Sequence, residues 1–132
     1  MTGQAQAMFA DDAASRSLGM ELVQAGDGAA VVRTRITRQM VNGYDIAHGG
    51  YLFMLADTAF ACACNSHGAV TVGTGAEISF VASARLGDEL VASAAMRTRY
   101  GRNGIYDVTV RRGDEIIAEF RGRSRTVAPD AS

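Results

Sequence analysis

The run HGGYLFMLADTAFACACNSHG, which begins at His48, limits the possible folds of this chain more than any other part. Its residues are apolar on every face of a helix, and a helix of that kind is usually buried. The run predicts one long helix over residues 49–66, ended by His67-Gly68. Because such a helix must be covered on most sides, the rest of the chain has to wrap around it.

Asp57 is the one charged residue in this predicted helix. A carboxylate among apolar side chains costs several kcal/mol unless it is paired, hydrogen-bonded or neutralised. Groups held at such a cost are often functional, which makes Asp57 a candidate catalytic residue. The alternative is that the helix turns Asp57 toward solvent or a polar interface. The residues alone leave both interpretations open.

The remaining sequence predicts an antiparallel sheet. Residues 20–37 read as a hairpin with its turn at Gly26-Asp27-Gly28. Further strands are expected after the helix, over residues 70–81, 89–100, 105–111 and 115–127. A short helix is expected over residues 10–18, a loop over 38–47, and loose termini at 1–8 and 128–132. We therefore expect a single α+β domain over residues 1–132, with one curved sheet wrapped around one helix.

A single wrapped sheet leaves its edge strands and part of the helix uncovered. Two sheets joined edge to edge in a dimer would cover both. We therefore expect a homo-oligomer.

Composition narrows the functional classes. Of the 132 residues, 48% are hydrophobic and 20% charged, and the formal net charge of -1 gives no overall attraction to nucleic acid. Neither a secretory signal nor an uninterrupted apolar run of about 20 residues is visible, so we expect no membrane association.

Cys62 and Cys64 point to different sides of a helix, which predicts buried free thiols and a reducing cytoplasm. His48 and His67 are the only histidines, so we expect no zinc site.

The sequence His48-Gly49-Gly50 stands at the predicted helix start. The first backbone N–H groups of a helix have no partners within it and lie at its positive end. Gly49 N–H, with Gly50 beside it, is therefore a candidate oxyanion donor for a substrate carbonyl. The alternative is that the glycines only allow a sharp turn into the helix. Asn42 could orient a water or the substrate, or form an ordinary Asn-Gly turn. His48 could shape the loop or act as an acid or base.

Spacing adds a constraint. Asp57 lies eight residues after Gly49, a rise of about 12 Å along a helix. An oxyanion donor and a base that act on one carbonyl each lie about 3 Å from the reacting atoms. If both residues act, they must therefore come from different subunits. Two antiparallel helices across a two-fold axis would pair Gly49 of one chain with Asp57 of the other.

The run from His48, preceded by Asn42-Gly43, resembles the hot-dog thioesterases of the phenylacetate degradation pathway. The resemblance extends from the hairpin near Met20 to the strand ending near Val127, and it is most specific in LADTAFA and ACNS. Similar pieces follow later in the chain, at Gly87-Asp88, in GIYD over residues 104–107, and in FRGRS over residues 120–124.

The resemblance implies a hot-dog fold and hydrolysis of acyl-CoA thioesters, such as phenylacetyl-CoA or its ring-hydroxylated forms, to free acid and CoA. It implies that Asp57 is the general base or nucleophile and that Gly49 N–H polarises the thioester carbonyl. Asn42 and His48 would complete the set of catalytic residues around the substrate. It implies no metal or bound cofactor, since CoA is part of the substrate, and a tetramer built as a dimer of dimers. Some relatives carry a further serine or threonine after the helix, and Thr74 lies in the matching region.

The CoA phosphates need cations, and all 13 basic residues of this chain are arginine. Arg102, Arg121 and Arg123 are the candidates, with Arg125 next in the same strand. Residues 121, 123 and 125 alternate and so share one face. The alternative is a solvated strand face.

Two other functions compete with thioester hydrolysis. A hot-dog dehydratase or hydratase would also act on acyl thioesters, but the Asp-x-Asn-x-x-His pattern of such enzymes is absent from this sequence. A non-catalytic acyl-CoA binding module would need no carboxylate in the helix.

Overall fold

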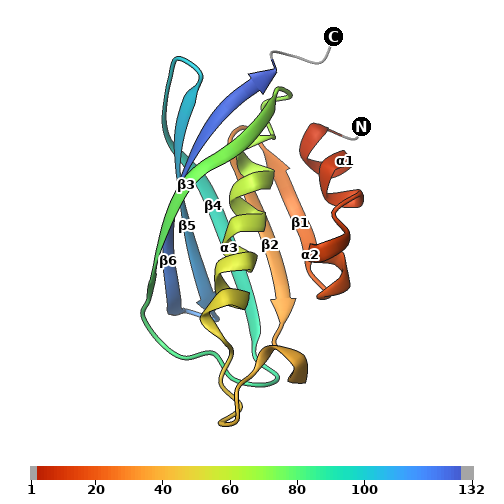
Figure 1. Cartoon of the computed structure of the whole chain (residues 1–132), viewed down its shortest axis with the longest axis vertical. Coiled ribbons are helices and arrows are strands. Elements are labelled where there is room, and N and C mark those ends of the chain that lie inside the picture. Colours follow the sequence, from red (N-terminus) through yellow and green to blue (C-terminus); the bar gives the residue numbers. More distant parts are fainter. Residues whose placement is uncertain (1–2, 129–132) are drawn as a thin grey trace.

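The computed structural model describes residues 3–128 of the chain. Within them, six antiparallel strands form one sheet in the order β1-β2-β4-β5-β6-β3, and the longest helix, α3, lies against it (Figure 1). The elements in chain order are α1 (Gln4–Ala10), α2 (Ala13–Ser17), β1 (Glu21–Gly26), β2 (Ala29–Arg35), the 3-10 turn η1 (Arg38–Met40), α3 (Gly49–Cys64), β3 (Val70–Phe80), β4 (Glu89–Tyr100), β5 (Asn103–Arg112) and β6 (Glu115–Ala128). The predicted hot-dog arrangement, a curved sheet around one long helix, is confirmed.

The face of the sheet toward α3 forms the core. Leu52, Leu55 and Ala59 of the helix are buried in one cluster with Val108 and Val110 of β5. Burial alternates along β5 as its sequence predicts, with inward apolar residues between partly exposed ones. Fully burying one such side chain contributes about 1.5–3 kcal/mol, so this cluster holds α3 on the sheet.

Phe60 fixes how deeply α3 sits on the sheet. Its ring lies against Gly122 of β6 and Gly73 of β3, where a Cβ would come within 2.8 and 3.1 Å of ring atoms. The ring also packs on Tyr106, with 5.7 Å between the ring centroids. A larger residue at position 122 would push Phe60 and the middle of α3 away from the sheet, because close-packed interiors have no spare room.

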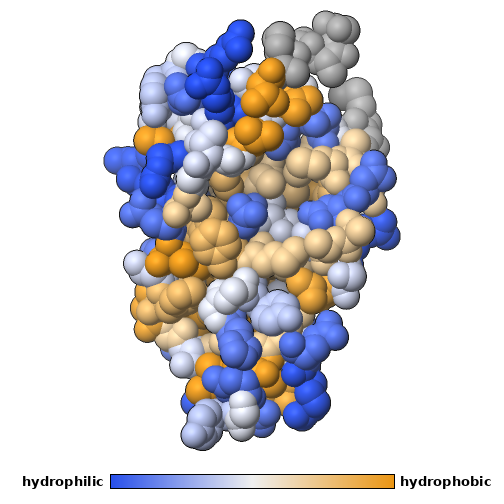
Figure 2. All heavy atoms as spheres, viewed as in Figure 1, coloured by the Kyte–Doolittle hydropathy of each residue, from blue (hydrophilic) through white to orange (hydrophobic). Residues whose placement is uncertain are grey.

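The opposite side of α3 is open within the single chain. Figure 1 looks onto this side, with β3 along one flank and α1 and α2 along the other. Phe53, Met54 and Ala61 are half-buried there, and Asp57 is exposed. Of the two interpretations of Asp57 that the sequence left open, the single chain shows the one in which the helix turns it toward solvent, because one sheet covers only one side of a helix. The expectation that a single sheet leaves part of α3 uncovered is met on this side. Figure 2 shows apolar surface gathered in the middle of the same view.

The N-terminal segment also differs from the prediction. The sequence suggested a loose terminus over residues 1–8 and one helix over residues 10–18, but α1 already begins at Gln4. Gln6 Nε2 donates to Ala25 O of β1 at 3.1 Å, and Ala5 is fully buried. Tertiary contacts of this kind outweigh weak local propensity. Residues 1–2 and 129–132 lie outside the described residues.

Two smaller differences concern element ends. At the C-terminal side, Ala128 was expected to be loose but pairs with Val70 in the sheet. Helix α3 ends at Cys64 rather than at residue 66, because the Asn65 side chain bonds both backbone groups of Thr71 at 3.0 Å.

Two predictions about turns and cysteines are confirmed. The β1–β2 turn places Asp27 and Gly28 at positive φ, 53° and 80°, as a tight hairpin turn requires. Cys62 and Cys64 are buried free thiols, and burial raises the pKa of each to about 12, so neither is a reactive thiolate at neutral pH.

Between residues 3 and 128, no helix is long and apolar enough to cross a membrane. In the same part of the chain, no three His, Cys, Asp or Glu side chains come together as a metal site.

Candidate active site

Asp57 lies in a pocket of about 440 Å³ on the open side of α3. The helix side of the pocket is largely apolar and includes Phe53 and Phe60, and α1 adds Met8. Strand β3 supplies the facing wall, much of it glycine or small side chains. The residues of that wall are Thr71, Val72, Gly73, Gly75 and Ala76. The arrangement suits an apolar group of a ligand, with one carboxylate placed to act on it.

The pKa of Asp57 is raised above its usual value. Partial burial beside the apolar wall is the main cause, and the negative charge of Asp12 adds to it. No hydrogen bond from residues 3–128 contributes to the shift of this carboxyl group. A carboxylate that lacks donors is a better proton acceptor than one already bonded, so Asp57 has the properties of a general base.

Asp12 is held near Asp57 by a short chain of hydrogen bonds. Ser15 Oγ donates to Asp12 Oδ2 at 2.7 Å and lies 2.9 Å from Thr58 Oγ1, which is 2.9 Å from Met54 O. Ser15 and Thr58 are both buried. The network fastens α2 to α3 one residue from Asp57. Thr58 therefore faces Ser15 and not its neighbour Asp57, as expected from the 100° step between adjacent helical residues.

The start of α3 leaves backbone donors free. His48 is its N-cap residue, in extended conformation, and makes no capping bond with its exposed side chain. The N–H groups of Gly49 and Gly50 bond no acceptor within residues 3–128. They lie at the positive end of a 16-residue helix, as an oxyanion site requires. His48 N–H is not available in the same way, since it donates to Met40 O at 2.9 Å.

Asn42 belongs to the loop that leads to this helix start. Its Oδ1 accepts from Tyr44 N at 2.8 Å and from Ile46 N at 3.2 Å, which is an Asx turn. The side-chain oxygen of Asn42 is therefore used in an ordinary Asn-Gly turn, one of the two alternatives that the sequence left open. The amide nitrogen Nδ2 makes no hydrogen bond within residues 3–128, so it is free to donate to another group.

Thr74 does not join the lining residues of the Asp57 pocket. It sits at an irregularity of β3, between Gly73 and Gly75, where one residue of the strand is left without a partner. Its hydroxyl donates to Arg123 O at 3.2 Å. The two flanking glycines, but not Thr74, line the pocket.

The strand arginines lie on the outer face of the sheet, away from α3. Arg121 donates to both oxygens of Asp107, at 2.6 and 2.9 Å, and Arg123 donates to Glu77 at 3.0 Å. Arg102, at the β4–β5 turn, is exposed and forms no ion pair within residues 3–128. A hollow of about 450 Å³ lies around Asp107 and Arg121, and these two residues form an ion pair with each other.

The two candidate catalytic groups, Gly49 N–H and the Asp57 carboxylate, lie at different places along α3. Gly49 opens the helix and Asp57 follows eight residues later, a rise of about 12 Å. One carbonyl carbon cannot contact both within a single chain. The open side of the helix exposes Asp57, and it is the surface through which a second chain could bring a Gly49 N–H to it.

Sequence reasoning missed four residues around the pocket. Met8 and Asp12 were assigned to a loose terminus and to an undivided helix, so neither was considered. Asn65 and Thr71 line the pocket through the bonded pair that ends α3. The Asn65 signal was available, because asparagine after an apolar helix is a common end residue. The Met8 contact depends on tertiary packing and had no local signal.

Comparison with known proteins identifies the family. The model of the thioesterase superfamily matches residues 44–119. The acyl-coenzyme A thioesterase PaaI of Escherichia coli (strain K12) is 41% identical over 93% of this chain and 89% of its own length. The solved structure of the E. coli PaaI protein, from the phenylacetic acid degradation operon, superposes with a TM-score of 0.92 at 39% identity over 96% of this chain and 93% of that chain.

A second solved structure, of smu.793 from Streptococcus mutans UA159, is bound to acetyl-CoA. It has a TM-score of 0.80 and 25% identity, over 84% of this chain and 90% of that chain. The predicted resemblance to hot-dog thioesterases is thus confirmed by sequence and by fold. This chain belongs to the thioesterase superfamily.

Proposed function

We propose that this protein hydrolyses acyl-CoA thioesters to the free acid and CoA, with phenylacetyl or ring-hydroxylated phenylacetyl as the acyl group. The observation that carries the proposal is Asp57, a carboxylate of raised pKa at the rim of an apolar pocket. Its support is the 41% identity to the E. coli acyl-coenzyme A thioesterase PaaI. The acetyl-CoA bound to the Streptococcus mutans relative supports CoA as the carrier.

The proposed chemistry uses two groups of this chain. Gly49 N–H donates to the thioester oxygen, which becomes negative as the carbonyl carbon turns tetrahedral. Asp57 takes a proton from a water molecule as that water attacks the carbon. The tetrahedral intermediate then breaks its C–S bond and releases CoA as the thiolate. No cofactor is required, because the thioester itself is the activated group.

Asp57 could instead attack the carbonyl directly and form an acyl anhydride, which water then hydrolyses. The two routes differ in where the solvent oxygen goes. In a single turnover in H₂¹⁸O, direct attack followed by water addition at the Asp57 carbonyl carbon leaves the label in Asp57. A general base places it only in the released acid. Label found in the Asp57 peptide by mass spectrometry therefore establishes direct attack, because water addition at the substrate carbonyl labels only the released acid by either route.

The site is shared between two subunits in this proposal, and β3 supports the pairing. The other edge strand, β1, is covered by α1, whereas β3 runs for 11 residues with only β6 beside it among the described strands. Gly75 of β3 lines the Asp57 pocket, and Phe80 at the end of the same strand lies against Gly49. Antiparallel pairing of two β3 strands near Ile78 would place the Phe80 end of one subunit opposite Gly75 of the other. Asp57 and a second subunit's Gly49 would then face the same carbonyl.

The acyl specificity is supported by the shape and chemistry of the pocket. A volume of about 440 Å³ suits a small ligand group. Phe53 and Phe60 give aromatic walls against which a phenyl ring can pack edge to face, an arrangement worth about 0.5–1.5 kcal/mol beyond its burial. A long acyl chain gains less from such a pocket, because α1 and Met8 limit it at one side.

Complementation between two inactive variants tests both the function and the shared site. Asp57→Asn and a bulky substitution at Gly49 should each abolish thiol release from phenylacetyl-CoA. Mixed subunits would rebuild one intact site per heterodimer, so random mixing should restore about a quarter of the wild-type activity. Complete absence of restored activity in verified heterodimers would contradict the shared site. An inactive wild type on aromatic, short-chain and long-chain acyl-CoA would contradict the function itself.

A further inference from the structure

The segment that joins β3 to β4, residues 81–88, lies beneath the loop that leads into α3. Three backbone contacts tie the two together: Ala47 N donates to Ala84 O at 2.8 Å, Leu86 N donates to Asp45 O at 3.0 Å, and Ile46 forms a bridge with Arg85. Ala47 is two residues before Gly49. The position of the α3 N-terminus relative to the sheet therefore depends on the position of segment 81–88.

That segment is itself fixed at both ends to the sheet. At its start, Val81 N and Ala82 N both donate to Ile117 O of β6, at 2.8 and 3.1 Å. At its end, Gly87 N donates to Ile36 O and Ile36 N donates to Asp88 O, both at 2.8 Å. The middle, residues 83–86, has no such strand pairing with the sheet and needs another support.

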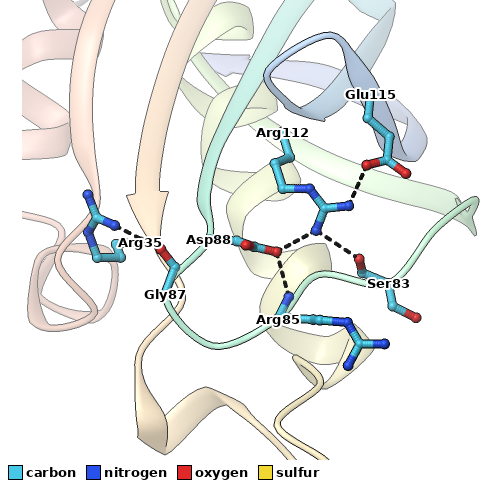
Figure 3. Close-up of polar contacts among 7 residues, drawn as sticks. All are labelled: Arg35, Ser83, Arg85, Gly87, Asp88, Arg112 and Glu115. Carbon is cyan, nitrogen blue, oxygen red and sulfur yellow. Dashed lines mark hydrogen bonds and ion pairs between the residues drawn. The ribbon is translucent and has the colours of Figure 1, made fainter.

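Arg112 at the end of β5 supplies that support (Figure 3). Its Nη1 donates to Ser83 O at 3.2 Å and to Asp88 Oδ2, and its Nη2 donates to Glu115. Asp88 Oδ2 also accepts from Arg85 N at 2.8 Å. One guanidinium nitrogen thus fastens both ends of the turn 83–88 to the sheet. We refer to the contacts of Nη1 with Ser83 and Asp88 as the Arg112 clamp.

The clamp is only partly accessible to water. The side chains of Arg112 and Asp88 are 31% and 22% exposed, well below the values of the surface pair Arg33–Glu21. Burial acts to raise the pKa of Asp88, but hydrogen bonds from Arg85 N–H and Arg112 hold it below the usual value. Asp88 therefore stays ionised in the range where Asp57 titrates, and the clamp does not change with pH there.

We propose that Arg112 and Asp88 are positioning residues that set the direction of the Gly49 N–H through segment 81–88. The chain of contacts runs from Arg112 to Ser83, from Ala84 to Ala47, and two residues on to Gly49. This inference rests on the proposed function of Gly49 as oxyanion donor. Charge-assisted bonds suit the task, because they are shorter and stronger than neutral ones and tolerate less displacement.

Kinetics of three variants test the proposal. Arg112→Met keeps the apolar stem and removes the clamp, and should lower kcat at least about tenfold, part of the roughly 10²–10³ lost when an oxyanion donor is removed. KM should stay within about twofold, since the donor acts mainly in the transition state. Arg112→Lys, whose ammonium can take the place of Nη1, should recover most of kcat. Glu115→Gln removes the charge of the Nη2 partner and should leave kcat near wild type.

The matched control is Arg111→Met, at the exposed residue just before Arg112 in β5. It should change neither kcat nor KM. A folded Arg112→Met with kcat within about twofold of wild type overturns the proposal. It is equally overturned if Arg112→Met and Glu115→Gln lose activity in parallel with their fraction of folded protein, because a purely structural role predicts that result. If Arg112→Met does not fold, Asp88→Asn takes its place, with the same expected loss of kcat.

Amide hydrogen exchange separates failure of this proposal from failure of the proposed function. Loss of the clamp should speed exchange of Ala47 N–H, whose bond to Ala84 O depends on the segment, and leave exchange in β1 unchanged. Arg112→Lys should retain protection. An inactive wild type refutes the thioesterase assignment, and hydrogen exchange then decides the clamp alone. Unchanged protection of Ala47 in Arg112→Met refutes the clamp whatever the activity.

Discussion

Phe80 lies directly against the Cα of Gly49. A Cβ at residue 49 would come within 2.7 Å of the phenyl Cζ, closer than real side chains approach. Phe80 is 54% exposed at the end of β3, so its ring covers the first residue of α3 from one side only. The glycine thus leaves room both for the ring and for a carbonyl group that approaches the helix N–H.

Gly49→Ala should impair activity far more than folding. The added methyl must displace Phe80 and narrows the approach to the N–H, so we expect kcat/KM to fall by at least about tenfold. Stability should change by less than about 1 kcal/mol, since alanine is the better helix former and the exposed ring can shift. Thiol release and thermal melting measure the two effects. Gly26→Ala is the control, because nothing lies within 4 Å of a Cβ there.

Asp57→Asn should abolish turnover and leave the fold intact. We expect kcat to fall by about 10³ or more, because the amide can neither accept the proton nor attack. Folding raises the pKa of Asp57, so the ionised form is less stable in the folded chain than in the unfolded one. The neutral amide removes that cost, and the melting temperature at pH 7 should be equal or higher. Near-normal turnover would refute the catalytic assignment.

At acidic pH, the dependence of kcat/KM on pH should follow the ionisation of Asp57. A base works when ionised, so kcat/KM should rise with pH through a midpoint above the ordinary aspartate value of about 3.9. Asp12→Asn keeps a capping side chain for α2 but removes the second charge. That midpoint should then move to lower pH. A midpoint that stays in place would show that Asp12 does not affect the base.

The free energy of unfolding should also depend on the ionisation of Asp57, but the contribution of this group should fall as pH rises, whereas kcat/KM rises. Because the folded pKa of Asp57 is raised, its contribution is fully present below the unfolded pKa and is lost as pH rises through the folded pKa. The free energy of unfolding of Asp57→Asn should therefore exceed that of the parent by a growing amount as pH rises from the unfolded to the folded pKa of Asp57. Urea unfolding at several pH values measures it.

Met8→Ala should widen the acyl preference. Met8 forms the α1 wall of the Asp57 pocket, so its truncation makes room for larger groups. One or two methylenes in an apolar pocket are worth about 1–3 kcal/mol, which predicts a change of about tenfold or more in the kcat/KM ratio of a longer acyl-CoA to phenylacetyl-CoA. Met96→Ala, on β4 and outside the pocket lining, should leave that ratio unchanged.

The arginines should differ in their effect on CoA binding. Arg102 forms no ion pair within residues 3–128, whereas Arg121 and Arg123 are already bonded to carboxylates. A phosphate must displace Asp107 or Glu77 to reach the latter two. We therefore expect Arg102→Ala to raise KM for acyl-CoA several-fold and to leave a pantetheine thioester unaffected. A larger effect of Arg121→Ala would place the phosphates on the outer face instead.

Much of the fold could be predicted because its signals are local. The apolar run after His48 indicated α3, and alternation along residues 105–111 indicated β5 with the correct buried face. Asp27 and Gly28 marked a turn by their tolerance of positive φ. Two local predictions failed at the N-terminus, where Gln6 bonds β1 and Asp12 caps α2. Ala25, the partner of Gln6, is 19 residues away and leaves no local pattern. The Asp12 cap bonds Ser15 N only three residues on, so it was a local signal that the prediction of one helix over residues 10–18 did not use.

The sequence by itself proposed Asp57 and Gly49 as catalytic residues and, through the helical rise between them, required that they act from different subunits if they act together. Only the tertiary structure decided that Asp57 stands on the open side of α3, because a sheet covers one side of a helix and the residue numbers do not say which. It also brought Met8 and Asp12 to Asp57, and Arg112 to the segment beneath Gly49. Contacts between distant residues depend on packing, and packing forms only when the whole sheet has closed around the helix.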